Sequence, residues 1–368
     1  MTEGKAEAAP ATSTSPKSDD RRTEFEFIKS LRQLASNRKQ SASPSTQPSL
    51  LVQGIGDDAA IIRESAGRNT LVTSDLLVED IDFHRDTTTP TYLGHKALAV
   101  SLSDIAAMGA RPRWALVSFG IPNDLWNSNF LDEFYEGFFA LADRYGVELI
   151  GGDVSRSPHK IVVDSTVLGQ CENDRAIRRR GAKPGDQVFV TGSLGGSAAG
   201  LRLLERGARL PAKYPASENT DPDSHTANQL FLRHLRPEPR VGWGLVLGQE
   251  TLATAMIDIS DGLSSDIHHL CAESKVGARL ESASIPFDPH VVEICGRRAL
   301  DPLLLALHGG EDFELLFTVA PENVARLPRK VDGIAITRIG EIKPAEEHVM
   351  LAEGSRVWDL EPQGWHHF

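Results

Sequence analysis

The sequence predicts a mixed α/β protein of two domains that follow a polar N-terminal tail. Apolar runs of strand length alternate with stretches of helical periodicity, and 368 residues are enough for two hydrophobic cores. An apolar content of 40% with 24% charged residues is typical of a globular protein. A polar and basic break lies between residues 171 and 186. We therefore expect an N-terminal domain over residues 23–172 and a C-terminal α/β domain over residues 173–368.

The composition restricts the possible partners and compartment. Residues 1–22 are rich in Ala, Ser, Thr, Pro and charge, which indicates a disordered tail without the apolar centre of a signal peptide. The formal net charge of −12 argues against nucleic acid as a partner, and no apolar run reaches membrane-spanning length. Three isolated cysteines indicate neither a disulfide framework nor a zinc site. We expect a cytoplasmic protein.

The elements of the first half follow from apolar periodicity. Apolar residues at helical spacing predict a helix from Phe25 to Leu34. Small and aliphatic residues predict a second helix at 94–108, which Gly109 ends as a C-terminal cap. The other expected elements are strands at 50–53, 59–62, 70–73, 114–121, 148–150 and 160–169 and a helix at 130–145.

The second half contains a strand, a glycine turn and a helix in succession from Gln187 to Leu204. This order is that of a phosphate loop, but no Gly-Lys-Ser/Thr sequence closes it, so we interpret it as a packing turn. The hydrophilic segment Pro211–Thr226 is expected to be a surface loop. A strand at 255–257, a helix through Leu270 and a strand at 313–319 complete the expected elements.

Acidic residues recur beside glycine and serine, in segments that suggest turns. The segments are Gly54-Ile55-Gly56-Asp57-Asp58, Thr73-Ser74-Asp75, Gly151-Gly152-Asp153, Asp258-Ile259-Ser260-Asp261-Gly262 and Gly309-Gly310-Glu311-Asp312. Asp104 is unusual because it lies inside the apolar helix, where a carboxylate needs a partner or a cation. Plainer explanations stay open: an ordinary turn at 54–58, a solvated helix face for Asp104, and an N-cap for Ser260 or Asp261.

Convergence of these aspartates would define the chemistry. Two carboxylates 4 Å apart repel by roughly 4 kcal/mol at an effective dielectric constant near 20, so a cluster needs divalent cations. Oxygen-only ligands favour Mg²⁺, and several Mg²⁺ ions beside many carboxylates indicate a nucleoside triphosphate as ligand. The expected reaction class is phosphoryl transfer or ATP-driven activation.

The order of these segments and their amino-acid sequences resemble those of the thiamine-monophosphate kinase family. The matching segments are Gly54–Ala59, Thr73–Asp75, Lys96–Ala110, Gly151–Asp153, Ile257–Leu263 and Gly309–Leu315. The resemblance implies direct transfer of the ATP γ-phosphoryl group to thiamine monophosphate, giving thiamine diphosphate. It also implies a two-domain fold like aminoimidazole-ribonucleotide synthetase and a homodimer formed through the N-terminal domains.

The resemblance further implies roles for individual residues. The implied metal ligands are Asp58, Asp75, Asp104, Asp153, Asp258 and Asp261, with Thr73 and Ser74 beside them. The residues implied to contact ATP are Gly152, Asp153, Arg179, Ser260 and Tyr135, and those implied to be catalytic are Asp58, Asp75, Asp258 and Arg179. Glu311 and Trp365 would hold the thiamine end, although Trp365 could equally be an ordinary packing residue.

One departure from the family pattern affects the substrate side. The family has Val-His-Phe after the Asp75 strand, where this chain has Ile81-Asp82-Phe83-His84. Either Asp82 or His84 would therefore take the place of the substrate-side histidine.

Three alternative functions are compatible with the same general features. An enzyme of the same fold that makes selenophosphate would need a reactive N-terminal cysteine, but no cysteine precedes Cys171. Closure of the aminoimidazole ring is the other activity of this fold. A non-catalytic Ca²⁺-binding protein would contain a twelve-residue aspartate-rich loop that ends in glutamate, and the sequence has none.

Overall fold

A computed structural model describes residues 29–30, 32–33, 50–64, 67–209, 222–298 and 300–364. The chain forms two units, and the larger one, residues 45–365, holds both sheets. The described residues of the smaller unit, 29–30 and 32–33, are helical, in agreement with the predicted helix. The predicted tail at 1–22 and Trp365 lie outside the described residues.

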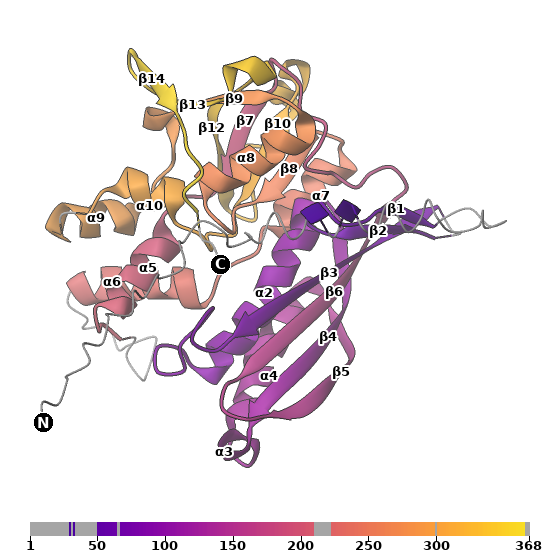
Figure 1. The fold of residues 1–368 in the computed structure, drawn as a ribbon, viewed down its shortest axis with the longest axis vertical. Helices are drawn as coiled ribbons and strands as arrows, with labels where there is room; N and C mark the ends of the chain where they lie inside the picture. Colours follow the sequence, from indigo (N-terminus) through magenta and orange to yellow (C-terminus); the bar gives the residue numbers. More distant parts are fainter. Residues whose placement is uncertain are drawn as a thin grey trace, which may run out of the picture. The chain divides into compact units, whose positions relative to one another are not determined.

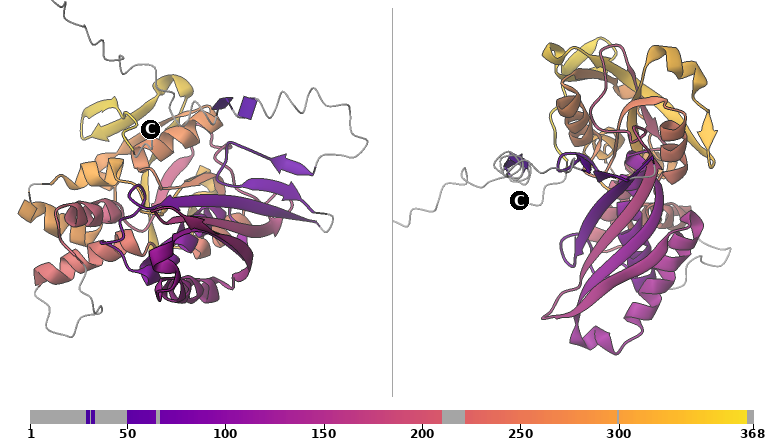
Figure 2. Two further views of the ribbon diagram at one scale, coloured as in Figure 1. Left: turned by 60° about the horizontal axis from the view of Figure 1, so that its bottom comes forward. Right: turned by 90° about the vertical axis from the view of Figure 1, so that its right-hand side faces the viewer.

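The first sheet has the strand order β1-β2-β3-β6-β4-β5. Strands β4 and β5 are parallel, and the other neighbours are antiparallel. Helices α2 and α4 lie on one face of this sheet, as Figures 1 and 2 show. The elements are β1 (Leu51–Gln53), β2 (Ala60–Arg63), β3 (Arg68–Val78), α2 (Pro90–Ala107), β4 (Arg111–Pro122), α3 (Asn123–Trp126), α4 (Phe130–Tyr145), β5 (Glu148–Ser157) and β6 (Val162–Glu172).

The second sheet has the order β14-β13-β9-β12-β7-β10-β8, and β11 pairs with β12. Its strands are β7 (Gln187–Thr191), β8 (Ala253–Asp258), β9 (Gly277–Glu281), β10 (Leu315–Val319), β11 (Lys330–Val331), β12 (Ile334–Lys343), β13 (Val349–Glu353) and β14 (Arg356–Asp359). Its helices are α5 (Gly196–Glu205), α6 (Pro222–Leu235), α7 (Val241–Gln249), α8 (Leu263–Ser274), α9 (Pro289–Arg298) and α10 (Pro302–His308). The mixed α/β fold class is therefore confirmed.

Helix α2 contacts both halves of the larger unit. It packs against β3, β4 and β6 of the first sheet, against β8 of the second, and against α4 and α7. Nearly all of its residues are buried, which explains why its sequence has no polar face. Gly94 permits the close crossing with α4, because a Cβ there would lie 1.9 Å from the Phe134 carbonyl oxygen. The helix ends before Gly109, whose φ of 68° agrees with the predicted cap.

The hydrophobic core is continuous between the two sheets. One cluster of buried side chains extends from α2 and α4 to Trp243 of α7 and Phe317 of β10. A second cluster lies between the second sheet and helices α8 and α10. The first sheet ends at Glu172 and the second begins at Gln187, but the division into domains at residue 172 stays a prediction.

Two predicted turns are wrong. Thr73-Ser74-Asp75 lies inside β3, and Gly151-Gly152-Asp153 lies inside β5, which extends to Ser157. Serine, glycine and aspartate favour turns locally, but pairing with neighbouring strands overrides that preference here. Gly152 is needed in the strand, because a Cβ would lie 1.8 Å from the Val117 carbonyl oxygen.

The predicted surface loop at Pro211–Thr226 is only partly described. Residues 222–226 form the first turns of α6, so the predicted loop is too long at its C-terminal end. Residues 210–221 lie outside the described residues.

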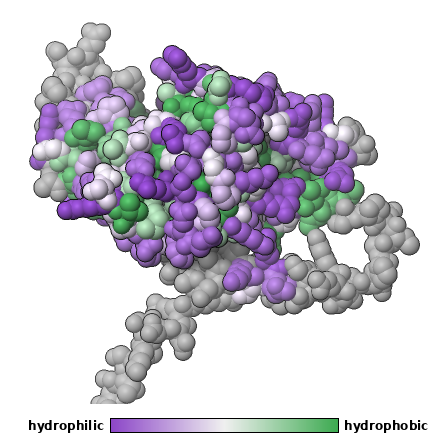
Figure 3. Space-filling model, turned by 90° about the horizontal axis from the view of Figure 1, so that it is seen from above, coloured by the Kyte–Doolittle hydropathy of each residue, from purple (hydrophilic) through white to green (hydrophobic). Residues whose placement is uncertain are grey.

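The face of the first sheet opposite α2 and α4 is open. Leu76 of β3 and Ile150 of β5 are 55% and 52% exposed, although they are large and apolar. On the side of the molecule shown in Figure 3, apolar side chains gather in separate areas of a mostly hydrophilic surface. Within the described ranges, none of the helices has both the length and the hydropathy needed to cross a bilayer.

Candidate active site

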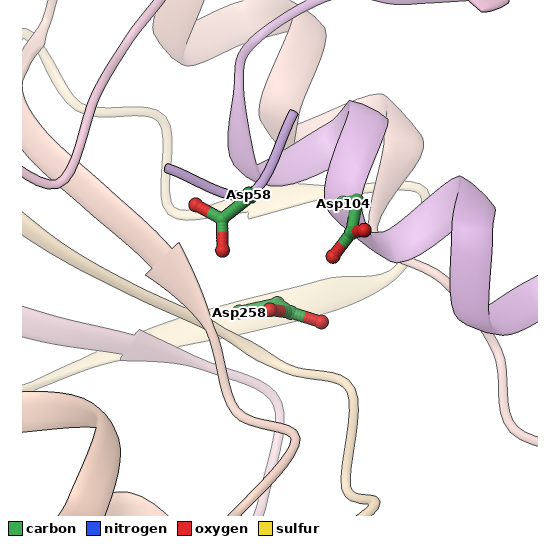
Figure 4. A group of neighbouring side chains, drawn as sticks. All are labelled: Asp58, Asp104 and Asp258. Atoms are coloured by element: carbon green, nitrogen blue, oxygen red, sulfur yellow. The ribbon is translucent and has the colours of Figure 1, made fainter. Parts of the chain in front are cut away.

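Three aspartates from distant parts of the chain meet near the C-terminal end of α2. Asp58 precedes β2, Asp104 belongs to α2, and Asp258 is the last residue of β8 (Figure 4). One carboxylate oxygen of each lies within 4.8 Å of the others. The turn at 54–58 is therefore more than an ordinary surface turn, and the explanation of Asp104 as part of a solvated helix face is wrong.

The cluster is short of positive charge. Burial raises the pKa of Asp75 to about 6 and that of Asp258 to about 7, and nearby carboxylates add to both shifts. Burial and the charges of Asp75, Asp258 and Asp58 raise the pKa of Asp104 well above its ordinary value. Carboxylates in such surroundings bind protons or cations.

Two serines of α2 orient two of these carboxylates. Ser103 Oγ donates to Asp258 Oδ2 at 2.6 Å, and Ser101 Oγ donates to Asp75 Oδ2 at 2.6 Å. Both serines are fully buried. They were not among the predicted site residues, although the sequence offers a signal: like Asp104, they are polar residues in a mostly apolar helix.

The side chains of Thr73 and Ser74 lie on opposite faces of the first sheet. Thr73 is buried and donates a hydrogen bond to Asp104. Ser74 is exposed, and its Oγ lies 3.1 Å from both oxygens of Asp164 and 2.9 Å from Thr166 Oγ1. Thr73 is thus part of the aspartate cluster, whereas Ser74 belongs to the open face.

Arg179 brings a positive charge to the cluster. Its Nη2 donates to Asp58 Oδ1 at 2.6 Å, and its backbone N–H donates to Asp57 Oδ1 at 3.1 Å. Burial and the charge of Asp58 raise the pKa of Asp57 to about 7. Asp58 Oδ2 is buried and has no hydrogen-bond partner among the described residues. An uncompensated oxygen beside the other aspartates is suited to a cation.

The turn after β8 brings Ser260 and Asp261 close to Asp258. Helix α8 has Gly262 as its N-cap, and Asp266 Oδ2 accepts the Gly262 N–H at 3.0 Å. The N-cap explanation for Ser260 and Asp261 is therefore wrong. The Ser260 carbonyl oxygen accepts the Glu311 N–H at 2.7 Å, so this turn also positions the acidic segment after α10.

Glu311 lies between two residues that were not among the predicted site residues. Lys96 Nζ lies 2.6 Å from Glu311 Oε1, and His234 Nδ1 lies 3.0 Å from Glu311 Oε2. Burial alone would raise the pKa of Glu311, but Lys96 and then His234 lower it to about 2. Like Ser101 and Ser103, Lys96 could have been predicted because it is a polar residue inside the mostly apolar helix α2. No feature of the sequence indicates a functional role for His234.

The segment after β3 holds the two candidates for the substrate-side position. Asp82 Oδ2 accepts the Val78 N–H at 2.8 Å and so closes the turn. His84 is exposed, with Nδ1 3.3 Å from Asp80 Oδ1. The structure thus gives Asp82 a local structural contact and leaves the His84 ring accessible.

Three of the implied ATP contacts lie away from the aspartate cluster. Asp153 is exposed on β5, three strands from β3, which is about 14 Å across a sheet. Gly152 precedes it on the same strand. Tyr135 of α4 is half-buried and packs edge-on against Phe119 and Phe134.

The glycine turn after β7 is a packing turn, as predicted. Buried Asp312 accepts the N–H groups of Gly195 and Ser197 at 2.7 and 3.2 Å. In a phosphate loop, amides at these positions would donate hydrogen bonds to a phosphate. Here they donate to the Asp312 carboxylate instead.

Known proteins resemble this chain over nearly its whole length. The family described as AIR synthase related protein, N-terminal domain, matches residues 56–171, and the corresponding C-terminal domain family matches residues 183–352. Thiamine-monophosphate kinase of Bacillus subtilis is 38% identical over 320 residues, which cover 86% of this chain and 93% of that protein.

Solved structures agree in sequence and in fold. AaThiL complexed with AMPPCP and TMP superposes with a TM-score of 0.76 at 32% identity, covering 94% of this chain and 97% of that one. Thiamine-monophosphate kinase from Stenotrophomonas maltophilia gives a TM-score of 0.68 at 36% identity, covering 88% and 96%.

Proposed function

The chain belongs to the thiamine-monophosphate kinase family, and we propose that its aspartate cluster carries out the family reaction with Mg²⁺. The protein phosphorylates thiamine monophosphate with ATP to give thiamine diphosphate. The observation that supports the role of the cluster is the convergence of Asp58, Asp104 and Asp258 within 4.8 Å of one another.

The cluster fits Mg²⁺ by its donor set. All its ligand atoms are carboxylate oxygens, and the buried Asp58 Oδ2 lacks a partner among the described residues. Asp58, Asp75, Asp104 and Asp258 would hold the ions, with Asp261 beside Asp258. Asp153 would not be part of this set, because it is exposed on β5, three strands from β3. When bound there, Mg²⁺ would neutralise the phosphate charge of ATP.

The protein's own contribution to the transfer is positioning and charge. Ser101 and Ser103 orient their aspartates, and Arg179, fixed by Asp58, lies where it can contact a phosphate once the cluster is filled. The acceptor oxygen of thiamine monophosphate is already anionic, so no general base is required. The main task is to bring two anionic groups together, which cations and an arginine accomplish.

Glu311 would hold the thiamine end of the substrate. Its side chain is 29% exposed, so it remains accessible, and its carboxylate accepts donors from the aminopyrimidine or faces the positive ring. Trp365 would stack on the cationic thiazolium. Of the two candidates after β3, exposed His84 is the better placed for contact, because Asp82 already closes its own turn.

A homodimer through the open face of the first sheet would complete the enzyme. Exposed Leu76 and Ile150 are large apolar side chains on that face, which suits it to a second copy. Ser74 and Asp153 lie on this face, so a second sheet placed there would cover them. The ATP contacts expected for Gly152 and Tyr135 stay predictions. Sedimentation equilibrium of wild type and Leu76→Lys tests this, with a shift from dimer to monomer expected.

Product analysis tests the proposed function. Protein, ATP, Mg²⁺ and thiamine monophosphate are incubated, and the thiamine esters are separated by chromatography. We expect one thiamine diphosphate for each ADP, and loss of both products with a chelator of divalent cations. ATP consumption without thiamine diphosphate would mean a different acceptor, and turnover that survives the chelator would contradict the role of Mg²⁺.

A further inference from the structure

Lys96 is a buried cation to which the proposed transfer assigns no role. It lies in the interior of α2, is 3% exposed, and has its Nζ 2.6 Å from Glu311 Oε1. A buried ammonium group is costly unless an anion faces it. Glu311 is that anion, and it comes from the turn after α10, more than two hundred residues later in the chain.

His234 of α6 approaches the other oxygen of Glu311. Its Nδ1 lies 3.0 Å from Glu311 Oε2 and 3.1 Å from Ser197 Oγ. A carboxylate only accepts hydrogen bonds, so Nδ1 must carry the proton. Burial and then the charge of Lys96 lower the pKa of His234, so the ring donates as a neutral imidazole. Each oxygen of Glu311 therefore has its own donor from a different helix.

The backbone of Glu311 is fixed as well. Its φ of 61° is in the left-handed region, which a residue other than glycine adopts only when its surroundings enforce it. Its N–H donates to the Ser260 carbonyl oxygen at 2.7 Å. The side chain is nevertheless 29% exposed, so a ligand can reach it. This combination of a constrained residue and an accessible carboxylate is typical of a recognition site.

We propose that Lys96 and His234 are positioning residues, which fix Glu311 as an acceptor-only carboxylate in a single orientation toward the thiamine end of the substrate. This inference rests on the role proposed above for Glu311. A carboxylate fixed in this way selects a ring that presents an N–H donor and rejects one that presents only acceptors at the same place. Lys96 and His234 thus act on substrate affinity through Glu311, without touching the phosphates.

The charged groups around Glu311 determine how its ionisation responds to mutation. Lys96 faces it from α2 and His234 from α6, while Glu205 of α5 faces His234. Asp312 of the same turn is directed toward the amides of α5. Without Lys96, the burial of Glu311 would raise the pKa of its carboxyl group. Protonation would then replace an acceptor with a donor and weaken binding of the substrate.

Steady-state kinetics of Lys96→Met test the proposal. We expect the KM for thiamine monophosphate to rise about tenfold, the loss typical of a charged hydrogen-bonding partner, while kcat and the KM for ATP change less than threefold. The ratio of this KM to the wild-type value should grow as the pH falls from 8 to 6. Lys343→Met is the matched control, because Lys343 Nζ also lies 2.6 Å from a carboxylate, Glu341, but on β12.

A double-mutant cycle with Glu311→Gln separates positioning from folding. If Lys96 acts through Glu311, then Lys96→Met adds less than twofold to the KM of Glu311→Gln. If Lys96→Met does not fold, other variants test the proposal. Lys96→Arg and His234→Gln keep a hydrogen-bond donor, so their KM for thiamine monophosphate should stay within threefold of the wild-type value. His234→Leu removes the donor and should raise this KM. A folded Lys96→Met or His234→Leu with wild-type KM, or full additivity in the cycle, would overturn the proposal. Failure of wild type to form thiamine diphosphate would instead refute the proposed function.

Discussion

The aspartate cluster at the end of α2 and the acidic segment after α10 are both made of buried carboxylates, but they are neutralised differently. Glu314 is fully buried with its Oε1 2.5 Å from Arg240 Nη2, and Glu311 faces Lys96 and His234. In the cluster, Arg179 faces several aspartates. The pKa of Glu314 is accordingly lowered by Arg240 despite burial, whereas that of Asp258 is raised by burial to about 7.

The difference is one of charge balance within the protein. Glu311 and Glu314 each face a cation of the protein, and their pKa values are lowered. The aspartates of the cluster outnumber the single arginine beside them, so we expect ions that arrive with the substrate to complete their charge. Four predictions test this distinction, beginning with the largest effect.

Asp258→Asn should lower turnover by about a thousandfold, because the cluster loses a ligand for Mg²⁺ and for the phosphates it carries. The melting temperature in chelator should not fall, since the substitution removes one of several repelling charges. Product formation by chromatography and thermal unfolding check the two parts. A variant that is less stable than wild type but fully active per folded molecule would contradict the assignment of Asp258 as a ligand for Mg²⁺.

Arg240→Met should have the opposite effect. It leaves Glu314 buried without its main partner, and breaking a buried pair typically costs about 3–5 kcal/mol in the free energy of unfolding. Urea denaturation measures this loss, and Arg202→Met is the control. Arg202 lies 3.0 Å from Glu205 at an exposed position, so its removal should cost less than about 1 kcal/mol. Equal losses in both variants would show that burial of the Glu314 pair is unimportant.

Ser103→Ala should weaken Mg²⁺ activation about tenfold, as expected when a residue that orients a metal ligand is removed. The Mg²⁺ concentration for half-maximal rate is the measurement, with Ser128→Ala as control. Ser128 Oγ donates to the Leu125 carbonyl oxygen at 2.7 Å on the surface. An unchanged Mg²⁺ requirement in Ser103→Ala would mean that Asp258 needs no orientation.

The pH dependence of stability should give the smallest effect. Because the pKa of Asp258 is raised to about 7 in the folded protein, the folded state holds a proton that the unfolded state releases, and stability falls as the pH rises from about 4 through 7. In chelator, the difference in melting temperature between Asp258→Asn and wild type should be larger at pH 8 than at pH 5, by roughly 2–4 °C in favour of the variant. A constant difference between pH 5 and pH 8 would contradict the pKa shift.

Much of the fold and of the cluster could be predicted from the sequence because the relevant patterns are local. The helix at 130–145 and the strand at 187–191 match in full, since their apolar periodicity is undisturbed. The prediction of turns at Thr73–Asp75 and Gly151–Asp153 is wrong, because the local amino-acid composition does not show which segments pair as strands in the fold. His234 could not be predicted at all, since only the tertiary fold brings α6 beside the turn at Glu311.

Counting bound Mg²⁺ tests the central claim most directly. Equilibrium dialysis of wild type and Asp258→Asn with saturating AMPPCP measures the ions held for each chain. We predict more than one Mg²⁺ per chain in wild type and at least one fewer in Asp258→Asn, with AMPPCP still bound. Equal counts in the two proteins, or no Mg²⁺ in wild type beyond that carried by the free nucleotide, would contradict the claim that the cluster is built for cations.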